Sequence, residues 1–109
     1  MRLDSKFSIT RLEMDGTWQL HTFRDGMTNV TLHAVGGDVN MTYANGGGVG
    51  GATGTTTLST PPSDDEGFLT IDEGMYLNRE TDLYANGEVF FYGAAGTFVE
   101  IEETAGIIR

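Results

Sequence analysis

Apolar and polar residues alternate along most of this chain, in short runs separated by two-residue turn signals. In residues 29–35, for example, Val30, Leu32 and Ala34 fall on one face of an extended strand and polar side chains on the other. The runs are punctuated about every ten residues by pairs that favour the positive φ angles of tight hairpin turns: Asp15-Gly16, Asp25-Gly26, Gly36-Gly37, Asn45-Gly46 and, further on, Asn86-Gly87. The pattern predicts an all-β chain of antiparallel strands.

The first half of the chain predicts four strands, over residues 7–12, 17–23, 29–35 and 38–43. Short turns between successive runs favour a meander, with one face solvated and one face in the core. The residues predicted to face the core are Trp18, Leu20, Val30, Leu32, Ala34, Val39, Met41 and Tyr43. Trp18 in particular is expected to be buried, because it shares its face with Leu20.

The second half predicts further strands at residues 68–71, 75–77, 88–92 and 97–103. Residues 82–85 and 88–92 are predicted to form a hairpin around Asn86-Gly87. Residues 78–83 could hold a single helical turn. In the last strand Val99 and Ile101 are expected to point inward, whereas the other face carries Phe98, Glu100 and Glu102.

Two connecting segments have a composition that does not suit a core. Residues 46–54 contain six glycines and no lysine, and a β-type run rather than a helix follows them, so a phosphate-binding loop is disfavoured. A flexible excursion at a sheet edge is the simplest interpretation, and ordering against a neighbouring subunit is the alternative. Residues 61–67 combine two prolines with three acids and a glycine, which indicates a rigid acidic connector.

About eight short strands in 109 residues fit one domain spanning residues 1–109. A central loop that splits two sets of strands favours two packed sheets, as in a small antiparallel β-sandwich or jelly roll with a glycine-rich loop excursion. A small closed barrel is the alternative fold.

The chain has 16 acidic and 6 basic residues and a net charge of −10, and eleven of the acids lie after residue 55. This charge disfavours nucleic-acid binding, which depends on cationic side chains that neutralise phosphates. The absence of cysteine rules out disulfides and thiolate zinc sites. The start of the chain lacks the apolar stretch of a signal peptide, and no run is long enough for a membrane-spanning helix, so synthesis in a cytoplasm is expected.

The polar residues form no recognisable catalytic or metal-binding motif. His21 and His33 fall on the polar faces of their strands, without a third ligand at zinc-like spacing. Residues 64–66 are three consecutive acids, which lack the alternating ligands of a calcium loop. Glu100 and Glu102 are spaced as ordinary carboxylates on an exposed strand face. The sequence therefore predicts no enzyme, no cofactor and no metal.

The aromatic residues divide into a core set and a surplus set. Trp18, Tyr43, Phe68, Tyr76 and Phe91 are assigned to the core. In residues 88–92 consecutive large side chains point to opposite faces, so a two-layer domain must expose one set or cover it. The residues predicted to contact a partner or a second subunit are Phe90, Tyr92, Phe98, Ile107 and Ile108, together with Gly47, Gly48 and Val49 of the glycine-rich loop.

Residues 82–103, with the sequence DLYANGEVFFYGAAGTFVEIEE, resemble the strand and glycine-turn segments of small all-β virion proteins of tailed bacteriophages. The short, acidic, cysteine-free chain, rich in glycine and threonine, is similar to these proteins in general composition. The resemblance implies a non-enzymatic structural protein of a phage particle that decorates or cements the capsid or another virion part. It also implies protein partners, a location in the virion and a homo-oligomeric state.

A carbohydrate- or receptor-binding module at a fibre or spike is the alternative function, with Tyr76 or Tyr92 stacking on sugar rings. The two functions differ in one structural expectation. In a structural protein the aromatic residues are covered by protein neighbours, whereas in a sugar-binding module they stand open beside polar groups in a groove.

Overall fold

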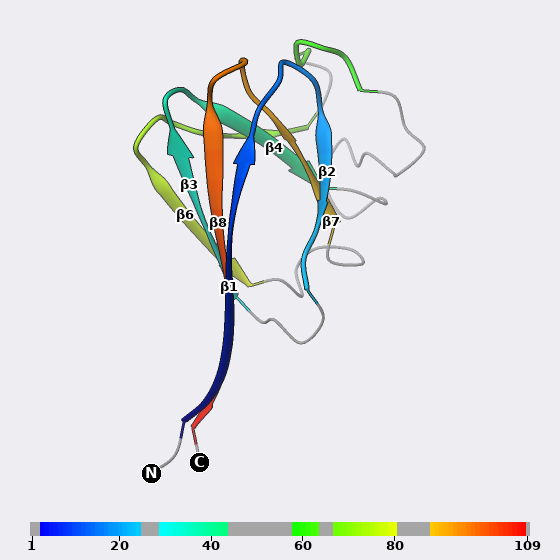
Figure 1. The fold of residues 1–109 in the computed structure, drawn as a ribbon. Helices are drawn as coiled ribbons and strands as arrows, with labels where there is room; N and C mark the ends of the chain where they lie inside the picture. The colour runs from blue at the N-terminus through cyan, green and yellow to red at the C-terminus, as the bar shows by residue number, and fades with distance from the viewer. Residues whose placement is uncertain (1–2, 25–28, 44–57, 64–66, 81–87, 109) are drawn as a thin grey trace.

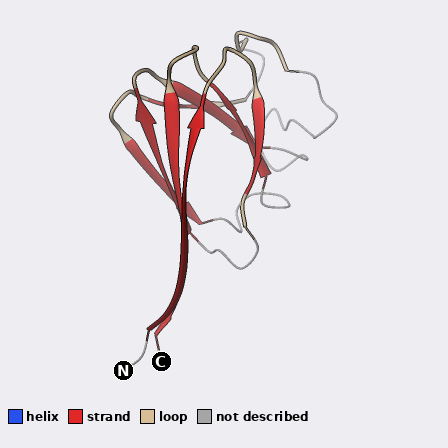
Figure 2. Ribbon diagram, in the orientation of Figure 1, coloured by secondary structure: helices blue, strands red, loops and turns tan. Residues whose placement is uncertain are grey.

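The computed structural model describes residues 3–24, 29–43, 58–63, 67–80 and 88–108. These residues form eight strands and no helix (Figures 1 and 2): β1 (Leu3–Glu13), β2 (Gln19–Thr22), β3 (Asn29–Val35), β4 (Val39–Tyr43), β5 (Leu69–Ile71), β6 (Tyr76–Glu80), β7 (Glu88–Tyr92) and β8 (Phe98–Ile108). Within this part of the chain, no helix has the length and apolar character needed to cross a membrane. The prediction of an all-β fold is confirmed.

The strands form two four-stranded antiparallel sheets, with the order β1-β8-β3-β6 in sheet A and β2-β7-β4-β5 in sheet B. The pairing is nested: β1 pairs with β8, β2 with β7, β3 with β6, and β4 with β5. Contacts of β8 with β3 and of β7 with β4 complete the sheets. This order is that of a jelly roll, so the sandwich prediction is confirmed and the barrel alternative is wrong.

The predicted meander of the first four strands is wrong, because β1 to β4 alternate between the two sheets instead of lying side by side. The chain does turn at Asp15-Gly16 and Gly36-Gly37, as predicted, and Gly16 and Gly36 both have a φ of 81°. These turns carry the chain from sheet A to sheet B. The other three predicted turn pairs lie outside the described residues. A tight-turn signal locates the reversal of the chain, but it does not determine which strand becomes the partner.

Two local predictions in the second half are also wrong. Residues 78–80 belong to β6, whose pairing with β3 runs as far as Asn29 opposite Glu80, so no helical turn begins there. Both edges of β7 are occupied, by β2 and β4, which leaves no edge for a hairpin with residues 82–85. Residues 82–85 themselves lie outside the described part of the chain.

The core lies between the two sheets and is formed by residues that alternate with outward-facing ones. β3 and β8 have the clearest alternation, and the residues predicted to point inward from them are buried. Val39 and Met41 of β4 are buried as well. The buried core residues are Met14, Phe23, Val30, Leu32, Ala34, Val39, Met41, Ile71, Val89, Phe91, Val99 and Ile101. The side chain of Tyr43 lies outside the description.

The prediction of which face of β2 points to the core is wrong. His21 points inward and Phe23, just beyond β2, is buried, whereas Leu20 is 46% exposed and Trp18 is half-buried on the outer face of sheet B. The physical reason is contact with the segment of residues 58–63, which we call the strap and whose Leu58 packs against Phe90 on this outer face. Trp18 donates its indole N–H to the carbonyl oxygen of Ser59 in the strap, at 2.7 Å. The outer face of sheet B is therefore partly dry, and it accepts aromatic side chains.

Strands β1 and β8 continue beyond the sandwich. β3 accompanies β8 only as far as Asn29 opposite Thr104, whereas β1 pairs with β8 up to Leu3 opposite Ile108. Residues 3–6 and 105–108 therefore form a two-stranded ribbon, which projects from the body with the two chain ends side by side at its tip (Figure 1).

Candidate functional site

The outer face of sheet A brings four polar and aromatic side chains into one row across the strands. Arg11 lies opposite Glu100, Glu100 opposite His33, and His33 opposite Tyr76. Each residue comes from a different strand, in the order β1, β8, β3 and β6. Residues directly opposite each other in a sheet have neighbouring side chains, so the register alone builds this cluster.

The members of this row hold one another in place. The rings of His33 and Tyr76 are stacked, with centroids 4.1 Å apart and an interplanar angle of 9°. Nδ1 of His33 lies 2.9 Å from Oε1 of Glu100, and it is the donor because a carboxylate only accepts. Nε of Arg11 lies 3.9 Å from Oε2 of Glu100, and the Arg11 guanidinium lies 4.3 Å from the ring centroid of Phe98. The carboxylate of Glu100 is thus held from both sides.

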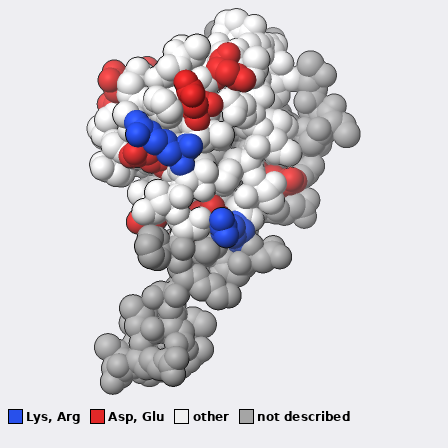
Figure 3. Space-filling model, in the orientation of Figure 1, with Lys and Arg blue, Asp and Glu red and all other residues white. Residues whose placement is uncertain are grey.

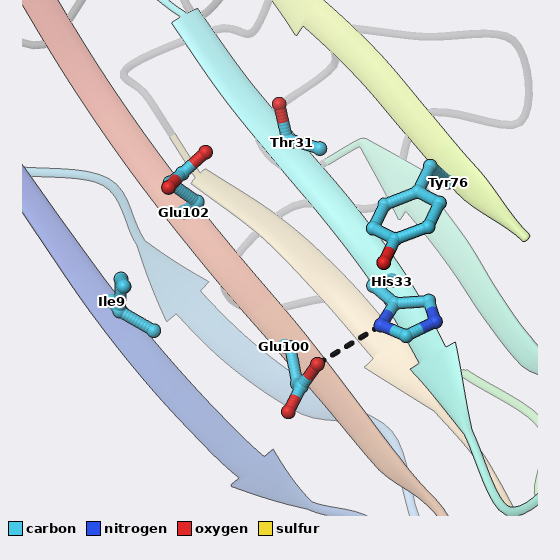
Figure 4. A pocket seen from close by; sticks show the side chains of 6 residues that line it. All are labelled: Ile9, Thr31, His33, Tyr76, Glu100 and Glu102. Carbon is cyan, nitrogen blue, oxygen red and sulfur yellow. Dashed lines mark hydrogen bonds and ion pairs between the residues drawn. The ribbon is translucent and has the colours of Figure 1, made fainter. Parts of the chain in front are cut away.

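A pocket of about 300 Å³ opens beside this row, on the same face of the sheet. The next row of the register supplies Ile9, Glu102 and Thr31, and the hydroxyl of Thr31 accepts a hydrogen bond of 3.0 Å from Asn78. The pocket is lined by Ile9, Thr31, His33, Tyr76, Glu100 and Glu102, whose side chains stand on one side of the sheet (Figure 4). Its lining combines two carboxylates with an aromatic ring and an aliphatic side chain.

The face of the described part that Figure 3 draws is mostly neutral, with dispersed acids. On the face drawn there, red acidic side chains are distributed over the body and only a few blue ones interrupt them. The negative charge is spread out on this face, and the pocket over sheet A is one place where two carboxylates share a concave surface.

A second polar pair lies inside the sandwich. Glu103 of β8 is 1% exposed, and its Oε2 lies 3.5 Å from Nε2 of His21 on β2, so the pair links the two sheets. The backbone N–H of Arg24 donates to the other carboxylate oxygen at 2.7 Å. Nε2 of His21 makes no hydrogen bond, although it is buried. The rings of Phe23 and Phe91 pack against that of His21, with centroids 5.2 and 6.1 Å away.

Burial lowers the pKa of His21 below its ordinary value, because the charged imidazolium loses its hydration between the sheets. The carboxylate of Glu103 opposes this shift without cancelling it. His21 is therefore held as the neutral ring at neutral pH.

The residues predicted to contact a partner do not gather at one place. Phe90 is 8% exposed beneath Trp18 and Leu58, and Tyr92 is half-buried with its ring 5.6 Å from that of Trp18. These two lie on the outer face of sheet B, whereas Phe98 lies half-buried on the outer face of sheet A. The surplus aromatic face of β7 is thus covered by the chain itself.

The remaining partner-contact candidates lie at the limits of the described chain. Ile107 and Ile108 belong to the ribbon by their backbone pairing, and their side chains are outside the description. Gly47, Gly48 and Val49 lie outside the described residues altogether. Contact of these residues with a partner remains a prediction.

The predicted aromatic core is right for Phe91, which is fully buried, and wrong for Tyr76, which is 68% exposed. Tyr76 is the first residue of β6, an edge strand of sheet A, and its side chain points away from the core. Phe68 is half-buried.

Metal binding finds no support in the residues that the structure describes, because they contain no group of three or more histidine or acidic side chains close enough to hold an ion. His21 and His33 each face a carboxylate instead. Residues 64–66, considered for calcium, lie outside the described chain.

Sequence reasoning missed both polar clusters, although a signal existed for one of them. Glu103 continues the inward series of Val99 and Ile101 at a spacing of two, which indicates a buried acid. The cluster of His33 with Glu100 and Tyr76 had no such signal, because it depends on which strands become neighbours.

No protein-family model matches the chain, and no curated protein sequence and no solved structure matches it significantly. The jelly-roll assignment therefore rests on strand order and pairing.

Proposed function

We propose that the protein is a non-enzymatic structural component of a phage particle, which attaches to the capsid or another virion part through protein contacts. The observation that carries this proposal is the ribbon formed by residues 3–6 and 105–108. An isolated pair of strands is marginally stable in water and needs a third strand or a packed layer. Among the described residues, neither β3 nor any other strand accompanies the ribbon. A neighbouring protein that packs on the ribbon would stabilise it.

Two further features support the same role. The β3-side edge of β8 has no strand partner beyond Thr104 within the described chain, and such an edge is a template for pairing with another chain. Leu69, Met75 and Tyr76 expose large apolar groups near β5 and β6, the edge strands of the two sheets. Jelly rolls occur in viral capsid proteins, and also in lectins, so the fold agrees with the role without deciding it.

The test compares the protein with a variant whose ribbon cannot dock. We expect the wild-type protein to self-associate in multi-angle light scattering and to co-sediment with phage particles assembled without it. The double substitution Ile107→Lys and Ile108→Lys should abolish both behaviours, because charge opposes burial of the ribbon. Leu20→Lys, at an exposed position of the body, is the matched control and should leave both intact.

Circular dichroism melting of both variants checks that the sandwich is folded. If the ribbon variant still associates like the wild type, the attachment element is wrongly assigned. A wild-type protein that stays monomeric at high concentration and never co-sediments with the particles excludes the structural role.

A further inference from the structure

The pocket on the outer face of sheet A is separate from the ribbon. It lies where all four strands of sheet A are paired, over the two rows that contain Glu100 and Glu102. None of the residues that line it belongs to the ribbon that carries the attachment proposed above. A hollow that joins an open aromatic ring to a few polar groups is the common form of a small-ligand site.

Two apolar side chains flank the pocket. Ile9 on β1 is 64% exposed and Tyr76 on β6 is 68% exposed. They stand three strand spacings apart, about 14 Å. Since the stack on His33 uses only one face of Tyr76, most of this ring remains open. The stack also fixes the ring orientation, which reduces the entropy lost when a ligand binds.

The polar floor of the pocket selects the charge of the ligand. Glu100 and Glu102 line it, and neither lysine nor arginine is among the described residues that line it. Phosphate, sulfate and sugar acids are therefore repelled. Carboxylates accept strong hydrogen bonds from hydroxyl groups, and Glu100 is already oriented for this by His33 and Arg11.

We propose that this pocket binds a neutral hexopyranose unit of a polysaccharide. The C–H face of the sugar ring packs on the open part of Tyr76 or on Ile9, and its hydroxyl groups donate to Glu100 and Glu102. The volume of about 300 Å³ is at the lower end for small-ligand sites and suits one sugar ring. Such a shallow site binds a single sugar weakly, and copies of the protein arrayed on a particle gain avidity for a polymer.

The test is a titration of the full chain, labelled with ¹⁵N, with the methyl glycosides of glucose, galactose and mannose, followed by NMR. We expect saturable shifts of the amides of Thr31, His33, Glu100 and Glu102 with at least one of these sugars. Tyr76→Ala should weaken that binding up to about tenfold, the upper range for one aromatic contact. Glu102→Gln should weaken it several-fold, because a neutral amide accepts weaker hydrogen bonds.

The matched control is Met75→Ala, which removes an exposed neighbour of Tyr76 that is not among the residues lining this pocket. It should bind like the wild type. The proposal is overturned if no glycoside gives saturable shifts at these amides, or if Met75→Ala and Tyr76→Ala lose binding equally. It is also overturned if N-acetylneuraminic acid, or an arginine- and lysine-rich peptide, shifts these amides while the neutral glycosides do not.

Discussion

Gly93 occupies a position at which even a methyl group meets the core. A Cβ placed there would lie 2.6 Å from Cγ and 3.0 Å from Cβ of Met14, and 3.4 Å from the carbonyl oxygen of Asp38. Met14 is 1% exposed and is held by a backbone hydrogen bond of 2.7 Å to Thr97. Because the Cβ of Met14 cannot rotate away, the backbone itself has to move to admit a side chain at position 93.

Gly93→Ala is expected to lower the free energy of unfolding by about 1–3 kcal/mol, the usual effect of overpacking. Urea unfolding followed by circular dichroism measures this loss. In the double variant with Met14→Ala, the total loss should be smaller than the sum of the two single losses, because the space vacated by Met14 accommodates the methyl group. Strictly additive losses would show that the two positions do not interact.

His21 makes the stability of the sandwich depend on pH. Its pKa is lowered by burial, so the unfolded chain takes up a proton on this histidine at a higher pH than the folded chain does. The contribution of the neutral, buried ring is fully present above the ordinary histidine pKa, near 6.5. It is lost progressively as the pH falls below that value.

We therefore expect the free energy of unfolding of the wild type, minus that of His21→Gln, to decrease as the pH is lowered from 7.5 to 5. The subtraction cancels the carboxylates that do not contact position 21. Urea unfolding at several pH values measures the difference. A difference that stays constant or grows on acidification contradicts the lowered pKa.

At the scale of elements, the strap converts the outer face of sheet B into a second, smaller apolar cluster. Phe90 is its buried centre, and Trp18 and Leu58 pack against it from the β1–β2 connection and the strap. The indole hydrogen bond to Ser59 fixes the strap over β7. Alternation predicts that the outer face of sheet B is exposed to solvent, but Trp18 and Leu58 cover Phe90 on that face.

Trp18→Ala is expected to cost about 2 kcal/mol of unfolding free energy, less than the roughly 3–5 kcal/mol of a fully buried tryptophan, because Trp18 is only half-buried. Trp18→Phe keeps most of the packing and loses the hydrogen bond, so its loss should be about 1 kcal/mol. Leu20→Ala, on the same face and exposed, is the control and should change stability little. A loss for Trp18→Ala no larger than that of the control would exclude the strap as a stabilising element.

Alternation predicted the core-facing residues correctly in strands that have one face in the core and the other exposed to solvent. β3 and β8 carry small and branched apolar residues on one side and polar residues on the other, so period two identifies both the strand and its orientation. β2 carries His21 on its inner face and Leu20 on its outer face, so its most apolar side chain points away from the core and alternation assigns the wrong face to the core. The inward Glu103 also breaks the rule, because its compensation by His21 and Arg24 comes from distant sequence.

At the scale of the whole molecule, the sequence predicted two packed sheets but not their partners. The row from Arg11 to Tyr76 exists because β8 lies between β1 and β3, and β3 between β8 and β6. Arg11 and Glu100, which face each other, are separated by most of the chain. No local pattern encodes such a neighbourhood, so the candidate site followed from topology rather than from a motif.

The nested pairing also bears on how the molecule folds and opens. Closing a loop costs entropy that rises with its length, and each inner pair, once formed, shortens the loop that the next pair outward has to close. The chain therefore folds most easily from β4 and β5 outward, on the order of milliseconds to seconds for such non-local pairing. Leu3 and Ile108 form the outermost pair, so the ribbon closes last and opens first. It can exchange partners while the sandwich stays folded.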